Sequence, residues 1–239
     1  NHQQEIKIPS VGILTPTIGT KYLEETIQCI QRQSHANVKH YIVIDGKQYS
    51  KSVHKIVDKY LNSNMQVPII LTELEENVGG GGWNGHRVYG SFPFLMDTQW
   101  VTYLDEDNVL DRHFCSKMLI NIYKNKYTEI IKDVASDGND GNNEKEQVVE
   151  KLPEYAYCLR NIVDPDGNFI CHDLCENLGF TKNILNGYFI DTSCYMLKRE
   201  LAIAISNVWH SHNKPLYYQD KIVFNHLYQN YNGKRYCQV

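Results

Sequence analysis

Residues 100–107 read WVTYLDED, a short run of β-branched and aromatic residues that ends in three consecutive carboxylates. Such a run, followed at once by polar residues, is typical of a buried strand that emerges into a loop. Similar runs occur upstream in VGILT (11–15), VKHYIVID (38–45) and VPIILTE (67–73). The sequence therefore predicts four strands before residue 106.

Helix-like segments separate these strands. They lie around residues 22–30, from about 50 to 61, and from about 84 onward. This alternation predicts an α/β fold: a Rossmann-like, mostly parallel sheet with helices on both faces and right-handed crossovers. Because such sheets bind ligands at the carboxyl ends of their strands, we expect the functional residues directly after the strands.

The second half has a different pattern. A helix is predicted from about 111 to 126, and the polar stretch 133–147, DVASDGNDGNNEKEQ, is predicted to be a mobile surface loop. YAYCLRNIVD and NFICH flank the turn signal DPDG and indicate a hairpin, GYFIDTSCYML indicates another strand, and helices are predicted over 199–208 and 219–229. We expect this half of the sheet to be mixed or antiparallel.

Length, charge and hydropathy argue against several classes of protein. The 239 residues suit one domain, and 24 basic against 28 acidic residues give a net charge of -4, which argues against a nucleic-acid binder. No apolar run is long enough to span a bilayer, and the polar start NHQQEIK has no signal-peptide core. We therefore expect a cytoplasmic protein. The first residue is Asn1 rather than Met, so the chain is also interpreted as a domain cut from a longer protein.

The seven cysteines are odd in number, scattered, and mostly embedded in apolar segments, which predicts buried thiols in a reducing compartment. Cys171, His172 and Cys175 have side chains that suit zinc, but a second ligand pair at a fitting spacing is missing. We favour the interpretation of core cysteines beside a loop.

Asp105, Glu106 and Asp107 follow a predicted buried strand, where adjacent carboxylates repel one another unless they share a cation. Mg²⁺ and Mn²⁺ commonly bridge one or two carboxylates to substrate phosphates, which points to a nucleotide diphosphate. The alternative is a solvated acidic turn. The position of these acids, at the ligand-binding end of a parallel strand, favours the metal site.

Other strand ends point to the same crevice. The first strand leads into Thr15, Pro16 and Thr17, and the second ends at Asp45, a carboxylate able to accept from an imide N–H or a ribose hydroxyl. Each is weak evidence alone, because Pro and Asp-Gly turns are ordinary loop chemistry. Together they predict one pocket.

The segment 76–90, ENVGGGGWNGHRVYG, places four glycines before a Trp, an Asn, a His and Arg87. Glycine lets backbone amides approach a ligand closely, and an Arg neutralises phosphate through forked hydrogen bonds. The segment matches neither a P-loop nor the dinucleotide fingerprint. A flexible linker would explain the glycines but not the side chains that follow them.

Two carboxylates in the second half are candidates for chemistry. Asp220 lies in the first turn of a predicted helix, where it is either an ordinary helix cap or a general base for an acceptor hydroxyl. Asp191, in FIDTSCYML, is a second candidate for the general base, and its alternative role is to bind the sugar or the acceptor.

Taken in order, five motifs resemble those of the inverting family 2 glycosyltransferases of the GT-A fold: TPTIG (15–19), IVIDG (42–46), NVGGGGWNGHR (77–87), YLDEDN (103–108) and YYQD (217–220). The resemblance covers nearly the whole chain. It implies a single GT-A domain over 1–239, with a nucleotide-binding half at about 8–110 and an acceptor-binding half at about 111–239. It also implies a nucleotide-sugar donor, usually a UDP-sugar, and Mn²⁺ or Mg²⁺ at an acidic DXD motif.

The resemblance assigns roles to individual residues. The resemblance implies that Thr15, Thr17 and Asp45 hold the nucleoside, together with the loop that carries Asn77, Gly79 and Arg87. It implies that Asp105 and Asp107 serve the ribose and the metal-bound diphosphate as metal ligands, and that Asp220 is the catalytic base. Pro16 and Glu106, from their places in the same segments, and Asp191 are also predicted to bind the donor. The implied reaction is one displacement at the anomeric carbon with inversion, by an enzyme of the hexosyltransferase class. The four glycines, and Gln219 where the family often has Glu, depart from the family pattern.

Rival interpretations remain open. VTYLDEDNVL also fits the pattern of haloacid-dehalogenase-type phosphatases, with Asp105 as nucleophile. That pattern normally ends the first strand of its core, whereas here an α/β series of about a hundred residues precedes it. A nucleotidyltransferase would carry its glycine-rich loop directly after the first strand. A non-catalytic nucleotide-sugar-binding module would keep the pocket but lack turnover.

Overall fold

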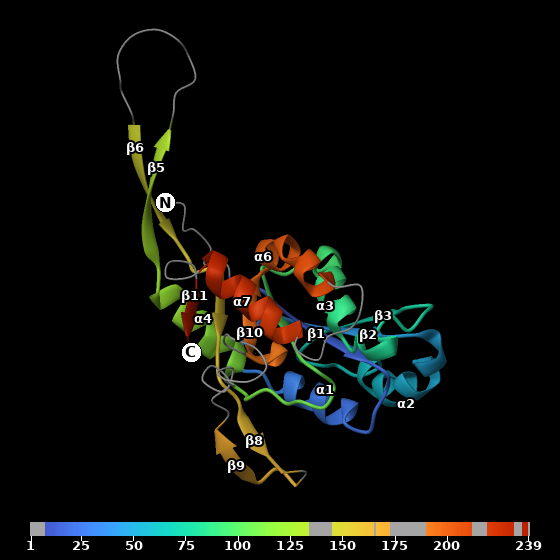
Figure 1. The fold of residues 1–239 in the computed structure, drawn as a ribbon. Helices are drawn as coiled ribbons and strands as arrows, with labels where there is room; N and C mark the ends of the chain where they lie inside the picture. The colour runs from blue at the N-terminus through green and yellow to red at the C-terminus, as the bar shows by residue number, and fades with distance from the viewer. Residues whose placement is uncertain are drawn as a thin grey trace.

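The computed structural model describes residues 8–133, 145–164, 166–172, 190–211, 219–231 and 236–238 (Figure 1). The four strands predicted in the first half are all present: β1 (Val11–Thr17), β2 (Val38–Ile44), β3 (Ile69–Glu73) and β4 (Trp100–Tyr103). β1 pairs in parallel with both β2 and β4, and β3 pairs in parallel with β2. The parallel half of the sheet is therefore confirmed.

The strands of the second half extend this sheet in mixed directions. They are β7 (Tyr155–Tyr157), β10 (Tyr195–Lys198) and β11 (Tyr236–Gln238). β10 runs antiparallel to both β4 and β7, whereas β11 runs parallel to β7. The seven strands follow the order β11-β7-β10-β4-β1-β2-β3, which confirms the expected mixed half.

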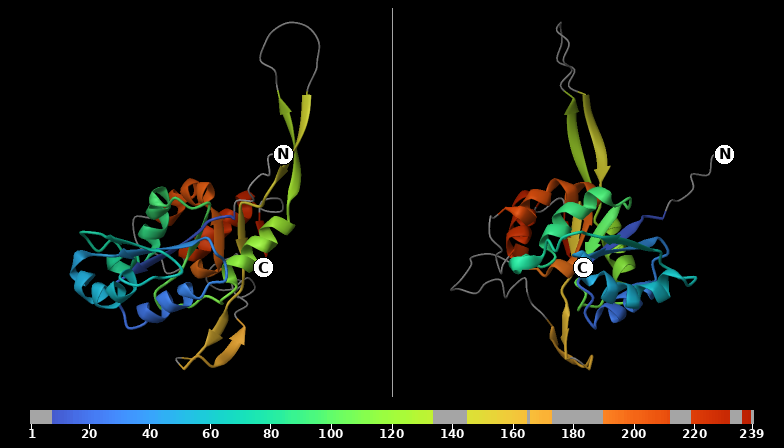
Figure 2. Two further views of the ribbon diagram at one scale, coloured as in Figure 1. Left: turned by 180° about the vertical axis from the view of Figure 1, so that it is seen from behind. Right: turned by 90° about the vertical axis from the view of Figure 1, so that its right-hand side faces the viewer.

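Helices cover both faces of the sheet, as the two views in Figure 2 show. One face carries α1 (Leu23–Gln31), α2 (Ser50–Leu61) and α4 (Phe114–Lys124); the other carries α3 (His86–Ser91), α6 (Arg199–Ala204) and α7 (Gln219–Tyr231). Short 3₁₀ turns lie between them: η1 (Lys47–Tyr49), η2 (Gly80–Gly82), η3 (Phe92–Leu95), η4 (Thr192–Cys194) and η5 (Ser206–His210).

Strand alternation divides the core between these two helical layers. On β10, Tyr195 and Leu197 pack on the side of α6 and α7, and Met196 between them packs on the side of α4. On β1, Ile13 packs toward α4, and Leu14 packs toward α3. Successive side chains of a strand point to opposite faces of the sheet, and helices cover both faces here. Successive residues are therefore both apolar, as the sequence runs predicted.

Two predicted strands are shorter than expected. In GYFIDTSCYML the described strand begins only at Tyr195, because Asp191 caps the 3₁₀ turn η4 and turns the backbone away from the ladder. YAYCLRNIVD is divided into β7 and β8 (Asn161–Val163), and β8 forms the predicted antiparallel hairpin with β9 (Phe169–His172).

A second hairpin, β5 (Tyr127–Asp133) with β6 (Lys145–Lys151), projects from the body of the molecule (Figure 1). The predicted mobile loop 133–147 overlaps the ends of these two strands, and its residues 134–144 lie outside the described residues. No helix in the described parts of the chain is long and apolar enough to cross a membrane.

The described cysteines are only partly as predicted. Cys29, Cys115 and Cys194 are buried, Cys158 is half-buried, and Cys171 is exposed on β9. The interpretation of Cys171 as a core thiol is wrong, because the two-stranded β8–β9 hairpin leaves it exposed. Cys175 lies outside the described residues.

The close approach of α3 to η5 gives a first prediction. A Cβ added to Gly90 would lie 2.6 Å from Cε1 of His210, 2.8 Å from Cβ of Trp209 and 2.9 Å from the carbonyl oxygen of Ser206. We expect Gly90→Ala to lower the free energy of unfolding by about 1–3 kcal/mol through overpacking, although Ala favours helices. Urea denaturation measures this change.

Ser91→Ala is the matched control, because Ser91 is the next residue of α3 and is exposed. A Gly90→Ala protein at least as stable as Ser91→Ala would contradict the tight packing of α3 on η5.

Candidate functional site

A cavity of about 520 Å³ opens where β1, β2 and β4 end. Nine of the residues predicted for the site line it: Pro16, Thr17, Asp45, Asn77, Gly79, Asp105, Glu106, Asp107 and Asp220. Its volume falls within the ordinary range for small-molecule sites. Segments far apart in the sequence thus meet at the carboxyl edge of the sheet.

Glu106 joins the loop after β4 to the loop after β1. Its carboxylate accepts hydrogen bonds from the Thr17 hydroxyl at 2.6 Å, the Thr20 amide at 3.0 Å and the Ile18 amide at 3.2 Å. Its carbonyl oxygen accepts from the hydroxyl of Thr26 in α1 at 2.8 Å. Hydrogen bonds to a charged acceptor are the stronger kind, so Glu106 fixes one wall of the cavity.

Asp45 organises the opposite wall. Its two carboxylate oxygens accept from the amides of Val78 at 2.7 Å and Gly79 at 2.8 Å, and its side chain is buried. A Cβ on Gly79 would fall 2.2 Å from the carbonyl oxygen of Asn84 and 2.5 Å from Oδ2 of Asp45. The glycine segment is therefore tied to the end of β2, which the flexible-linker interpretation does not predict.

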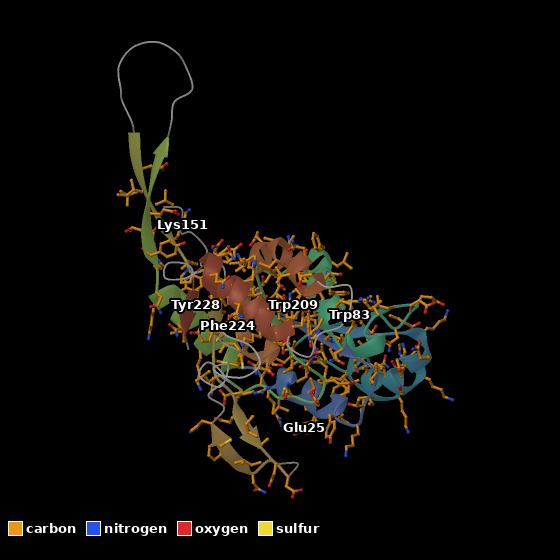
Figure 3. The ribbon with its side chains drawn as sticks, in the orientation of Figure 1. Glu25, Trp83, Lys151, Trp209, Phe224 and Tyr228 are labelled. Atoms are coloured by element: carbon orange, nitrogen blue, oxygen red, sulfur yellow. The ribbon has the colours of Figure 1, made fainter. Side chains whose placement is uncertain are left out.

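Arg87 is not brought to the cavity lining. Its guanidinium lies over the ring of Trp83, 4.3 Å from the centroid, and donates to the carbonyl oxygen of Val78 at 3.3 Å. Figure 3 marks the position of Trp83 beside α3. The cation–π contact directs this charge to the glycine segment rather than to a ligand in the cavity.

Thr15 and Asp191 also lie outside the cavity lining. Thr15 is fully buried, and its hydroxyl pairs with Nε2 of buried His40 at 3.0 Å. Asp191 pairs with Arg160 and accepts from the Ser193 amide at 2.9 Å, which caps η4. Burial raises the pKa of Asp191, and the Arg160 charge opposes that rise. Both side chains hold the walls together.

Asp105 is the most perturbed carboxyl of the cavity. Burial raises its pKa to about 7, the carboxylates of Asp191, Asp220 and Asp107 add to the rise, and a hydrogen bond donated by the Tyr89 hydroxyl opposes it. Carboxylates this close together repel one another, which favours either a cation bound between them or a proton on one of them.

The carboxylates of Asp105 and Asp107 could bind a divalent cation if a substrate supplied further ligands. Among the residues that the structure describes, no three His, Cys, Asp or Glu side chains gather as a complete metal site. Asp105 and exposed Asp107 nevertheless face one cavity with oxygen donors, the ligands that Mg²⁺ and Mn²⁺ prefer. Mg²⁺ is usually bound through one or two carboxylates plus phosphate oxygens, so the donor set fits such an ion.

Asp220 enters from the first turn of α7 and has partners that the sequence did not reveal. Its Oδ1 accepts from the Thr192 hydroxyl at 2.7 Å, and Nε2 of His86 lies 3.3 Å from the same oxygen. Thr192, His86 and Tyr89 all line the cavity, yet none had been assigned a role. The one feature of the sequence that pointed to His86 was its position just after the glycines. No feature of the sequence pointed to Thr192 or Tyr89.

Comparison with known proteins gives likenesses of structure only. No protein-family model matches the sequence, and no curated protein matches it. The crystal structure of Staphylococcus aureus TarS 1–349 aligns with a TM-score of 0.51 at 14% identity over 96% of this chain, and its complex with UDP-GlcNAc aligns with a TM-score of 0.50 at 14% identity, also over 96%. The mannosyltransferase PcManGT of Pyrobaculum calidifontis, in complex with GDP-Man and Mn²⁺, gives 0.51 at 13% identity over 98% of this chain.

This chain spans a little over half the length of those chains: 58% and 56% for the two TarS structures and 55% for PcManGT. At these identities the likeness establishes the fold. The predicted GT-A-like architecture is therefore confirmed.

The role of Asp45 gives the second prediction. Asp45→Asn removes the charge and turns one acceptor into an N–H₂ that faces a backbone amide, so we expect the free energy of unfolding to fall by about 1–3 kcal/mol. Urea denaturation measures it. Asp58→Asn, on the exposed face of α2 next to His54, is the control and should change stability little. Equal stability of the two variants would show that Asp45 does not hold the glycine segment.

Proposed function

We propose that this chain is a metal-dependent glycosyltransferase that moves a sugar from a nucleotide-sugar donor, a UDP-sugar, to an acceptor hydroxyl with inversion. In this proposal residues 1–239 form one domain, with a nucleotide-binding half at about 8–110 and an acceptor-binding half at about 111–239. The observation that carries the proposal is the cavity in which Asp105 and Asp107, after β4, and Asp220, from α7, share one lining.

The nucleotide-binding role is supported by a buried polar atom in the wall of the cavity. Oδ1 of Asn77 is buried and has no hydrogen-bond partner among the residues that the structure describes, although Asn77 lines the cavity. A buried polar atom without a partner costs free energy unless a ligand satisfies it. Pro16, Thr17 and Gly79 line the same space, and TarS, a protein of similar fold, was solved in complex with UDP-GlcNAc.

Asp105 and Asp107 would hold a divalent cation, Mn²⁺ or Mg²⁺, together with the donor diphosphate. The mannosyltransferase of similar fold was crystallised with GDP-Man and Mn²⁺. A bound cation supplies positive charge that stabilises a leaving diphosphate. Burial raises the pKa of Asp105 to about 7, and the neighbouring carboxylates add to the rise. A cation would offset the repulsion among these carboxylates.

Asp220 is proposed as the proton acceptor for the incoming hydroxyl. Single displacement needs one carboxylate on the acceptor side and no covalent intermediate, and Asp220, from α7, shares the cavity lining with the acids that follow β4. Asp105 follows β4, the fourth strand of the chain, whereas the phosphatase pattern normally ends the first strand of its core. This argues for the transferase over a phosphatase that uses Asp105.

The donor-binding prediction is tested with a thermal-shift panel of UDP, UDP-GlcNAc and GDP-mannose, each with and without Mn²⁺. A ligand at about 100 times its Kd stabilises the folded state by about 2.7 kcal/mol, which is about 5–10 °C for a chain of this size. We expect the largest rise in Tm with a uridine ligand plus Mn²⁺, and a smaller one without the metal. No shift with any nucleotide, but one with Mg²⁺ and beryllium fluoride, would support the phosphatase instead.

The role of Asp220 gives a separate prediction. Asp220→Asn should keep the nucleotide-dependent rise in Tm and lower nucleotide release from the bound donor at least about a hundredfold, because the amide cannot accept a proton. Asp166→Asn, in the exposed β8–β9 turn, is the control. Wild-type protein that binds donor without turnover would identify a non-catalytic binding module, and a fully active Asp220→Asn variant would exclude Asp220 as the base.

A further inference from the structure

The carboxylate of Asp220 is held on one side only. Thr192, from η4, donates to Oδ1 at 2.7 Å, and Nε2 of His86, at the start of α3, lies 3.3 Å from that same Oδ1. Among the residues that the structure describes, no hydrogen bond reaches Oδ2. Two segments that are far from α7 in the sequence therefore converge on a single oxygen of the proposed base.

The surroundings of His86 fix which of its ring nitrogens is available. The ring stacks on Trp209, with centroids 5.8 Å apart and an angle of 28° between the planes, and Trp209 is fully buried. Nδ1 is buried and has no hydrogen-bond partner within the described parts of the chain. The side chain as a whole is 12% exposed. Nε2 thus faces Asp220, while Nδ1 faces the protein interior.

The preceding residue keeps the imidazole in this place. A Cβ on Gly85 would lie 2.9 Å from the ring of Tyr89 and 3.0 Å from Pro16, so α3 begins in tight contact with the end of β1. Because Tyr89 also donates to Asp105, the start of α3 is packed against both acidic sides of the cavity. His86 has little freedom to turn Nδ1 outward.

This arrangement separates two possible roles for His86. A histidine that took the acceptor proton itself would need a free ring nitrogen open to the cavity, but Nε2 is directed at Asp220 and Nδ1 is buried. A histidine that positions a carboxylate needs only an N–H directed at it, and such contacts in ligand-free sites are often long and tighten when substrate binds. The positioning role requires a proton on Nε2.

We propose that His86 and Thr192 are positioning residues for Asp220: they hold Oδ1, so that Oδ2 is the oxygen that receives the acceptor proton. The inference rests on the proposed function. In the step, the acceptor O–H bond breaks and its proton passes to Oδ2. The hydroxyl oxygen's electron pair forms the new bond to the anomeric carbon, and the bond from that carbon to the diphosphate breaks, with its electron pair leaving on the diphosphate oxygen.

The test separates hydrogen bonding from packing with paired variants. His86→Phe keeps a ring on Trp209 but removes the N–H, whereas His86→Gln keeps an N–H donor but removes the ring. Thr192→Val removes the hydroxyl at nearly constant shape, and Thr192→Ser retains it. His54→Phe is the control, because His54 contacts Asp58 at 2.8 Å on the exposed surface of α2. The assay is release of UDP from UDP-GlcNAc, or of GDP from GDP-mannose, with Mn²⁺ and water as acceptor.

We expect His86→Phe and Thr192→Val each to lower kcat about tenfold, the effect of losing a hydrogen bond to a charged group. KM for the donor and the donor-dependent rise in Tm should stay unchanged, because neither side chain is proposed to touch the donor. His86→Gln and Thr192→Ser should recover most of the lost kcat, and His54→Phe should match the wild type.

The outcomes distinguish the two proposals. If His86→Phe is active and His86→Gln is not, the ring contributes packing alone and the positioning role is overturned. Fully active His86→Phe and Thr192→Val proteins, beside an inactive Asp220→Asn protein, overturn the positioning role and leave the proposed function standing. A wild-type protein that releases no nucleoside diphosphate from either donor overturns both.

Discussion

The cavity depends on the parallel pairing of β1 with β2 on one side and with β4 on the other. In this register Thr17 lies opposite Ile44, and Leu14 lies opposite Tyr103, so that both neighbours of β1 end at the same edge. Asp45 follows Ile44 directly, and Asp105 comes two residues after Tyr103. An antiparallel neighbour would have placed one of these acids at the far edge of the sheet.

Three consecutive acids at that edge have three different environments. Asp105 is crowded by other carboxylates and accepts from Tyr89, Glu106 is occupied by donors of the loop after β1, and Asp107 is exposed in the cavity. The division arises beyond the end of β4 at Tyr103, where residues 106 and 107 form a turn and the alternation of a strand no longer applies. Both carboxylate oxygens of Glu106 accept hydrogen bonds from the protein, whereas among the described residues no donor reaches Oδ2 of Asp105 or the carboxylate of Asp107.

Short-range patterns in the sequence predicted the parallel half of the fold well, because period-2 and helical spacing depend on local chain geometry. The placement of Thr15 was also readable: it shares strand parity with Ile13, which packs in the core. His86 and Arg87 were not separable from sequence, since neighbouring helix positions point about 100° apart and the choice between them depends on Trp209, from a distant segment. The role of Thr192 could not be predicted for the same reason, because its contact with Asp220 joins two distant segments, η4 and α7.

The glycine run shows how a departure from a family pattern acquires a physical meaning. A linker tolerates a side chain at any position, but here the first glycine, Gly79, approaches both Asp45 and the carbonyl oxygen of Asn84 too closely for a Cβ. Gly81 adopts φ 71°, a left-handed conformation that side chains disfavour. The first demand arises from the anchoring of this segment to Asp45 at the end of β2. The glycines therefore shape the wall that leads into α3, and α3 in turn carries His86 to Asp220.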